Sequence, residues 1–282
     1  MSPVYDCSTD EGRREGVGKA VEAVRAGEIV VLPTDTVYGV GADAFSAEAV
    51  ASLLAAKGRG REMPPPVLVP SVRTVDGLAT DVPPWARDLI RAFWPGPLTL
   101  VFKAQSSLMW DLGETNGTVA LRMPQDDIAL AVLSEVGPMA VTSANLTGQP
   151  AATTATDAAS QLGAAVSVYL DGGPTTSTEV STILDCTGDE YVVLRAGAVT
   201  EEQLRAALEP QEPEPAPDVE PDVEVEPEGE PKVDDAAEAA EAADTPEPAA
   251  TQAIELPADP ATSTTDGTDG TDSTLPGDPH ER

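Results

Sequence analysis

The chain has 282 residues, of which 49 are acidic and 16 basic, giving a net charge of −33 at pH 7. This charge works against nonspecific RNA binding, which depends on Lys and Arg neutralising phosphates. The two cysteines, Cys7 and Cys186, are too few for a disulfide framework or a four-cysteine zinc site. The single histidine, His280, lies near the end of the chain, so the folded part has no histidine for a catalytic triad or a metal site.

The composition changes near residue 208. Residues 1–208 mix apolar periodic segments with turn residues, whereas residues 209–282 hold 23 acidic and 2 basic residues among Pro, Ala and Thr. The second segment has too little apolar surface to offset its ordering entropy. We therefore expect one folded domain at 1–208 and a disordered acidic tail at 209–282. No segment reaches the ~20 apolar residues of a membrane span, and the start lacks a secretory h-region, so we expect a cytoplasmic protein without membrane contact.

Apolar periodicity and helix-end residues predict helices and strands that alternate along residues 1–208. The predicted helices begin at Ser8 (with Glu11 at capping-box spacing), Ser46, Asp81 (with Pro83), Asp126, Thr156 and Thr200 (with Gln203). The predicted strands cover residues 28–33, 67–69, 98–102, 118–123, 139–142, 166–170, 180–185 and 191–195. This alternation predicts an α/β domain built around a mixed twisted sheet.

A hydroxyl-rich segment, residues 33–39, follows the first predicted strand. If it is extended, Thr34, Thr36 and Tyr38 share one face and line one wall of a site. The glycines that follow would let a backbone or a ligand approach closely. The alternative is a tight connection whose hydroxyls satisfy backbone groups, and the local sequence supports both interpretations.

The stretch from Gly39 to Ala44 matches the relaxed dinucleotide pattern G-x-G-x-x-A. That pattern should follow its strand directly and open a helix. Here five residues separate it from Pro33, and the helix begins later, at Ser46. We therefore do not expect nicotinamide or flavin binding.

Basic residues gather at three places in an otherwise acidic domain. Lys57, Arg59 and Arg61 follow a predicted helix end, where the helix dipole explains one cation more readily than three. Arg122 and Arg195 each end an apolar strand, where an arginine can also be a simple rim residue. Together these residues indicate a cationic pocket for an anionic ligand such as a polyphosphate.

Two further polar runs have alternative interpretations. Residues 142–145, Thr-Ser-Ala-Asn, follow an apolar strand and offer hydroxyls and an amide to a ligand, but a turn or helix cap explains them as well. Asp126 and Asp127 most simply cap the helix that they begin.

Six motifs taken together, in this order, resemble the YrdC-like family, over residues 16–208. They are Pro33-Thr34-Asp35-Thr36-Val37-Tyr38-Gly39, Lys57-x-Arg59, Trp94-Pro95-Gly96-Pro97-Leu98-Thr99, Val119-Ala120-Leu121-Arg122-Met123-Pro124, Ser143-Ala144-Asn145-x-x-Gly148 and Leu194-Arg195-x-Gly197. Each motif alone is weak, whereas six in the family's order are highly specific.

The resemblance implies a single α/β domain whose twisted mixed sheet curves around a cationic cavity. It also implies a nucleotidyltransferase activity in which ATP, L-threonine and bicarbonate give threonylcarbamoyl-AMP and pyrophosphate, with Mg²⁺ bound to ATP and no metal site of the protein's own. The product would feed modification of adenosine 37 in tRNA by a downstream threonylcarbamoyl-transferase complex. Contact with tRNA and double-stranded RNA binding are further expectations from the same resemblance.

The resemblance also assigns roles by position. The implied L-threonine contacts are Thr36, Arg122 and Thr142. The implied ATP contacts are Lys57, Arg59, Met63, Thr118, Ser143, Ala144, Asn145 and Arg195, with Lys57 and Arg59 as catalytic residues. Two departures concern the substrate site: Leu68 stands where some relatives have histidine, and Pro64-Pro65-Pro66 replaces a more usual Pro-Leu.

Two other functions remain open on the sequence. One is an RNA-binding or ribosome-associated protein, because a basic groove in this fold can suit RNA. The other is an enzyme that forms a carbamoyl-adenylate from carbamoyl phosphate and ignores threonine.

Overall fold

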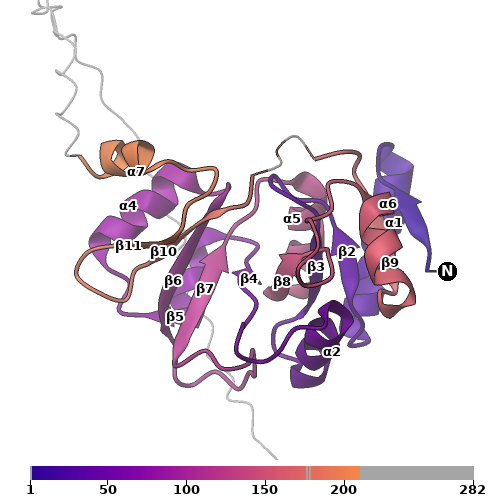
Figure 1. Ribbon diagram of the computed structural model, residues 1–282, viewed down its shortest axis with the longest axis horizontal. Helices are drawn as coiled ribbons and strands as arrows, with labels where there is room; N and C mark the ends of the chain where they lie inside the picture. Colours follow the sequence, from indigo (N-terminus) through magenta and orange to yellow (C-terminus); the bar gives the residue numbers. More distant parts are fainter. Residues whose placement is uncertain (1, 176, 178, 210–282) are drawn as a thin grey trace, which may run out of the picture. The chain divides into compact units, whose positions relative to one another are not determined.

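The computed structural model describes residues 2–175, 177 and 179–209 (Figure 1). One mixed, twisted sheet runs through this part of the chain. Its strands are β1 (Val4–Asp6), β2 (Val30–Leu32), β3 (Gly39–Asp43), β4 (Val67–Leu68), β5 (Ala79–Thr80), β6 (Leu98–Ala104), β7 (Thr118–Arg122), β8 (Met139–Ser143), β9 (Val168–Asp171), β10 (Thr182–Asp185) and β11 (Val192–Arg195). Their spatial order is β1-β9-β2-β3-β8-β4-β7-β6-β10-β11, and β5 pairs with β6.

Helices connect most of these strands. They are α1 (Asp10–Arg25), α2 (Ala47–Lys57), α3 (Val75–Leu78), α4 (Pro84–Phe93), α5 (Asp127–Val136), α6 (Ala155–Leu162) and α7 (Glu201–Leu208), with 3₁₀ turns η1 (Val72–Thr74) and η2 (Gly163–Ala165). The predicted α/β class is confirmed. The predicted list lacked β1, β5, α3 and both 3₁₀ turns, which are too short to show apolar periodicity. It also lacked β3, because the two glycines of Gly39–Asp43 are typical of a turn or loop.

Several helix ends are formed by the predicted side chains. Ser46 accepts a hydrogen bond from the backbone of Ala49, and Gly58 ends α2 in the left-handed conformation, with φ of 61°. Asp126 caps α5 by accepting from the backbone nitrogens of its first turn. Thr200 and Gln203 form the predicted capping box of α7. These local signals define where the helices start and stop.

Two predicted capping residues were wrong, and α4 begins at Pro84, directly after the predicted Pro83 and not at Asp81. The residue that caps α1 is Thr9, whose hydroxyl accepts from the Gly12 nitrogen at 3.1 Å, while the Ser8 nitrogen donates to Asp6 instead. The residue that caps α6 is Thr154 and not Thr156. In both places neighbouring hydroxyl residues compete for the same capping position, and only the local backbone geometry selects one of them.

Apolar cores lie on both faces of the sheet. Helices α1 and α5 pack against each other and, with β2, β8 and β9, bury Val21, Val24, Val30, Leu32, Val132, Leu133, Met139 and Leu170. The other core joins α2, α4, α6 and α7 to the sheet through Val31, Leu53, Leu54, Leu89, Ile90, Leu98, Leu100, Ala158 and Leu204. Consecutive β2 residues therefore enter opposite cores, as the pleat of a strand requires.

The acidic tail predicted at 209–282 lies, apart from Glu209, outside the described residues. Within the described part of the chain, none of the helices combines the length and the apolar character needed to cross a bilayer.

Candidate functional site

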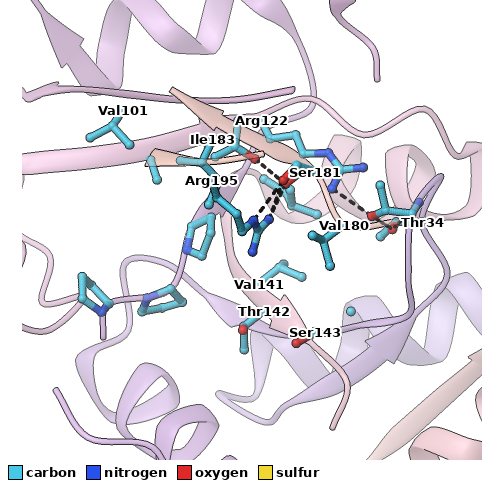
Figure 2. A pocket seen from close by; sticks show the side chains of 18 of the residues that line it. Thr34, Val101, Arg122, Val141, Thr142, Ser143, Val180, Ser181, Ile183 and Arg195 are labelled. Atoms are coloured by element: carbon cyan, nitrogen blue, oxygen red, sulfur yellow. Dashed lines mark hydrogen bonds between the residues drawn. The ribbon is translucent and has the colours of Figure 1, made fainter. Parts of the chain in front are cut away.

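A cavity of about 430 Å³ opens on the sheet (Figure 2). Residues two apart on neighbouring strands form its floor, including Thr99 and Val101 of β6 and Ser181 and Ile183 at β10. This spacing follows from the strand pleat, which sends alternate side chains to one face. Loop residues complete the wall: Thr34, Thr36, Val37, Arg59, Pro64, Pro65, Pro66, Leu112 and Thr115.

Three arginines line this cavity: Arg59 precedes the proline run, Arg122 ends β7, and Arg195 ends β11. No Asp, Glu or His side chain is among the described residues that line it. The predicted convergent cationic pocket is therefore present, and its hydroxyl-bearing walls suit a negatively charged ligand.

Each of the three guanidinium nitrogens of Arg122 donates to a protein atom. Its Nε donates to the Gly96 carbonyl at 3.0 Å, one terminal nitrogen donates to the Thr36 hydroxyl at 3.1 Å, and the other to Asp35 Oδ1 at 2.6 Å. The Arg122 side chain is 8% exposed. Burial lowers the pKa of Arg122 from its ordinary value, while the Asp35 carboxylate acts in the opposite direction. The guanidinium thus has a fixed orientation before any ligand arrives.

Arg59 contrasts with this arrangement. One terminal nitrogen donates to the Thr142 hydroxyl at 2.9 Å, and the buried Nε has no hydrogen-bond partner in the described structure. Burial lowers the pKa of Arg59, and Glu62 partly offsets this effect. A buried, unsatisfied cationic donor is costly, so its presence in a cavity wall indicates a place for an anionic ligand.

Arg195 is anchored by Ser181. Its Nε and one terminal nitrogen donate to the Ser181 carbonyl, at 3.0 and 2.7 Å, and the same terminal nitrogen also reaches the Ser181 hydroxyl (Figure 2). That hydroxyl in turn pairs with Thr99 at 2.9 Å. Burial lowers the pKa of Arg195, and the nearby charge of Arg122 adds to this effect. The other terminal nitrogen of Arg195 makes none of these bonds and remains available to a ligand.

The hydroxyl-rich segment combines the two interpretations that its sequence allowed. Residues 35–37 form a bend, so the segment is not the extended strand on which the shared-wall interpretation was based. Thr34, Thr36 and Tyr38 nevertheless all line the cavity. The Tyr38 hydroxyl donates to the Gly173 carbonyl at 2.6 Å and accepts from the Gly172 nitrogen. One hydroxyl therefore serves the backbone, as a tight connection predicts.

Gly39 and Gly41 serve strand packing. A Cβ at Gly39 would lie 2.7 Å from Val141 Cγ1, and one at Gly41 would lie 2.8 Å from Val141 Cγ2. Both distances are far inside van der Waals contact. These glycines let β3 pair with β8 beneath the cavity, and their close neighbour is the Val141 side chain.

Four of the residues assigned to ATP lie outside the cavity lining: Lys57, Met63, Ala144 and Asn145. Lys57 is only 3% exposed, and its ammonium donates to the carbonyls of Ser143 and Asn145. Burial, reinforced by the charge of Arg59, lowers the pKa of Lys57 to about 8. Lys57 thereby supports the turn after β8, because its donors are occupied by that turn. A direct phosphate contact by Lys57 remains a prediction that this geometry does not favour.

The other assigned residues do line the cavity: Thr36, Arg59, Thr118, Arg122, Thr142, Ser143 and Arg195. Sequence reasoning missed Asp35 as the partner of Arg122, and Ser181 and Thr99 as the support of Arg195. Asp35 carried a signal, since it lies inside the hydroxyl-rich motif. Ser181 carried only a weak one, since it is one of two neighbouring hydroxyl residues in a predicted strand.

Both departures from the family pattern fall on the cavity wall. Leu68 and the three prolines at 64–66 line it, so this region offers apolar contact where some relatives place an imidazole. Leu112 from the loop after β6 adds to the same apolar lining.

Comparisons with known proteins agree with this geometry. The Sua5/YciO/YrdC family model, described as "Telomere recombination", matches residues 22–197. A Mycobacterium tuberculosis protein provisionally named threonylcarbamoyl-AMP synthase is 54% identical over 208 residues, which cover 74% of this chain and 96% of the relative. The Bacillus subtilis threonylcarbamoyl-AMP synthase is 39% identical over 197 residues, covering 69% of this chain and 57% of the relative.

A solved structure shows the same likeness in three dimensions. The crystal structure of Pyrococcus abyssi Sua5 complexed with L-threonine superposes with a TM-score of 0.69 at 32% identity, covering 73% of this chain and 60% of that protein. The matched family model spans more than half of the sequence, and it includes every arginine of the cavity. The chain therefore belongs to the Sua5/YciO/YrdC family.

Proposed function

We propose that this protein is a threonylcarbamoyl-AMP synthase. It would convert L-threonine, bicarbonate and ATP into threonylcarbamoyl-AMP, pyrophosphate and water. Family membership supports this activity, as do the names of the relatives and the threonine-bound state of the Pyrococcus abyssi protein. The observation that carries the proposal is Arg59: a half-buried side chain whose buried Nε has no hydrogen-bond partner, in a cavity wall without carboxylates among its described residues.

The first step joins threonine to carbon dioxide or bicarbonate. The neutral amine of threonine attacks the carbon to form a carbamate and loses a proton from its nitrogen. With carbon dioxide no other group leaves, whereas with bicarbonate a C–O bond breaks and the hydroxide takes up that proton and leaves as water. The role of the protein is to hold the amino acid in position, which can supply much of the rate acceleration. Arg122 would bind the threonine carboxylate, and the hydroxyls of Thr36 and Thr142 would contact the rest of the molecule.

In the second step a carbamate oxygen attacks the α-phosphorus of ATP, and pyrophosphate leaves. Negative charge increases on the phosphate oxygens during this displacement, so preorganised cationic donors lower the barrier. Arg59 and Arg195 would provide these donors, and Ser143 and Thr118 would add polar contacts to the nucleotide. Mg²⁺ would enter with ATP, because phosphate oxygens are the hard ligands that it prefers and the cavity wall offers hydroxyls and arginines.

The product is a mixed anhydride whose threonylcarbamoyl group is activated for transfer to an amine. A downstream threonylcarbamoyl-transferase complex would use it to modify adenosine 37 of tRNA. We propose a cytoplasmic location for this chemistry, where its substrates are found. We also propose direct contact with tRNA or double-stranded RNA. Because the chain carries a net charge of −33, which repels phosphates overall, this contact would be confined to a small basic part of the surface.

The test is pyrophosphate release by the purified protein, with ATP, threonine and bicarbonate omitted one at a time. Release that requires all three, with threonylcarbamoyl-AMP identified by mass, is the expected result. Release that needs carbamoyl phosphate and ignores threonine would contradict the proposal and favour a carbamoyl-adenylate-forming enzyme. Absence of turnover, together with salt-sensitive RNA binding, would favour an RNA-binding protein.

A further inference from the structure

Asp35 lies directly behind the arginine to which the threonine carboxylate is assigned. Its Oδ1 accepts hydrogen bonds from Arg122 at 2.6 Å and from the Gln125 backbone nitrogen at 2.9 Å. The two side chains are 12% and 8% exposed. Asp35 does not line the cavity itself. It therefore joins the hydroxyl-rich segment to the end of β7 and to the start of α5 from behind the ligand site.

The hydrogen bonds around Arg122 have a definite direction. Thr34 donates its only hydroxyl proton to the Val37 carbonyl at 2.7 Å. In the 3.1 Å contact between the hydroxyls of Thr34 and Thr36, the donor must therefore be Thr36. Thr36 also accepts from Arg122. The Thr36 hydroxyl proton is therefore used in the bond to Thr34, so toward the cavity this hydroxyl can only accept a hydrogen bond.

The same count limits what Arg122 can do. A guanidinium has five N–H groups, and three of those on Arg122 are used by Gly96, Thr36 and Asp35. Two N–H groups remain, one on each terminal nitrogen, and a carboxylate can accept from two such groups in a forked arrangement. Because Arg122 and Thr36 both line the cavity, these two donors and the Thr36 acceptor are the groups that the two residues can offer to a ligand.

We propose that Asp35 is the positioning residue that fixes the Arg122 guanidinium, so that its two remaining N–H groups select the carboxylate of the amino-acid substrate while Thr36 accepts from its ammonium or hydroxyl group. This inference rests on the proposed function. Asp35 acts through Arg122 and touches no reacting atom. Ligands that lack a carboxylate next to a donor group leave part of this pattern unsatisfied, which costs affinity.

The variant Asp35→Asn tests this by removing the charge while keeping the shape. A charge-assisted hydrogen bond is roughly twice as strong as a neutral one, so the KM for L-threonine should rise about tenfold, while the KM for ATP changes less than about twofold. The matched control is Asp76→Asn, the same change in the exposed Arg87–Asp76 pair, which should alter neither value. Equal rises in both KM values, or an unchanged threonine KM, would overturn the proposal.

A second readout does not depend on catalysis. In protein labelled with ¹⁵N-arginine, the terminal N–H signals of Arg122, identified by their loss in Arg122→Lys, should be resolved in the wild type because the hydrogen bonds hinder rotation. In Asp35→Asn they should merge, and unchanged signals would refute the positioning role. If Asp35→Asn does not fold, Asp35→Glu serves, since it keeps the charge but displaces it by one methylene. Absence of threonine-dependent turnover in the wild type would contradict the proposed function, whereas the arginine signals would still decide the claim about Asp35.

Discussion

Arg122 and Arg59 line the same cavity but differ in how far the protein satisfies them. Arg122 donates to a carbonyl, a hydroxyl and a carboxylate. Arg59 makes one hydrogen bond, to Thr142, and its buried Nε has none in the described structure. The fold therefore orients the Arg122 guanidinium, whereas the Arg59 guanidinium keeps hydrogen-bond donors that a ligand can occupy. Substitutions at the two positions should therefore fail in different ways.

The largest expected effect is the loss of activity in Arg59→Ala. Removing a preorganised donor to charge that develops in the transition state costs on the order of 10²–10³ in rate, so pyrophosphate release should fall at least about 100-fold. The melting temperature should be unchanged or higher, because the substitution removes a half-buried cation whose Nε has no hydrogen-bond partner. Arg61→Ala is the control, since Arg61 is exposed and paired with Asp111, and it should keep near-normal turnover. Near-normal turnover in Arg59→Ala would remove Arg59 from the site.

Arg122→Ala should instead destabilise the fold. The substitution leaves the Asp35 carboxylate buried without its cation, and breaking such a pair typically costs about 3 kcal/mol. Denaturant unfolding should show this loss in the free energy of unfolding, whereas Arg59→Ala should stay within about 1 kcal/mol of the wild type. Equal stability of the two variants would contradict the contrast between the two arginines.

A third cation, Lys57, resembles Arg122, because protein oxygens accept hydrogen bonds from its ammonium. Its pKa is lowered to about 8 from 10.5, so between these values the unfolded chain holds more protons than the folded protein. The free energy of unfolding should therefore rise with pH in this window, by at least about 1 kcal/mol, relative to Lys57→Met. Urea titrations at pH 8 and pH 10 measure this difference. Lys19→Met, which removes an exposed lysine, should show no such rise, and a flat profile for Lys57 would refute the shift.

The smallest expected effect is that of removing residues 209–282. Every residue of the cavity lies before Leu208, so truncation after Leu208 should leave kcat/KM within about twofold of the full chain. Pyrophosphate release by the two proteins at equal concentration tests this. Loss of active protein on truncation would show that the acidic segment supports the fold.

Local features of the fold could be predicted from the sequence because their causes are local. Ser46 and Gly58 bound α2 through contacts within a few residues, and the capping box of α7 does the same. Short strands such as β1 have no periodicity to detect, and competing hydroxyls shifted the start of α1 by one residue. Residue type also predicted that the arginines converge on one cavity.

The supporting contacts of the site could not be predicted in this way. Asp35 and Arg122 are 87 residues apart, and Thr99 and Ser181 are 82 apart, so only the strand order brings them together. Lys57 shows the same limit. Its position beside Arg59 suggested a phosphate contact, but burial directs its ammonium to the carbonyls after β8. Tertiary packing therefore determines which cationic side chains have all their hydrogen bonds to the protein and which keep donors for a ligand.

Separate threonine and phosphate positions within the cavity are tested most directly by calorimetry. ATP and L-threonine are each titrated alone into two variants, Arg59→Ala and Thr36→Val. We expect each variant to lose binding of a different ligand. Arg59→Ala should lose ATP binding and keep threonine binding, and Thr36→Val should lose threonine binding and keep ATP binding. The same loss for both ligands in both variants would contradict separate threonine and phosphate positions within the cavity.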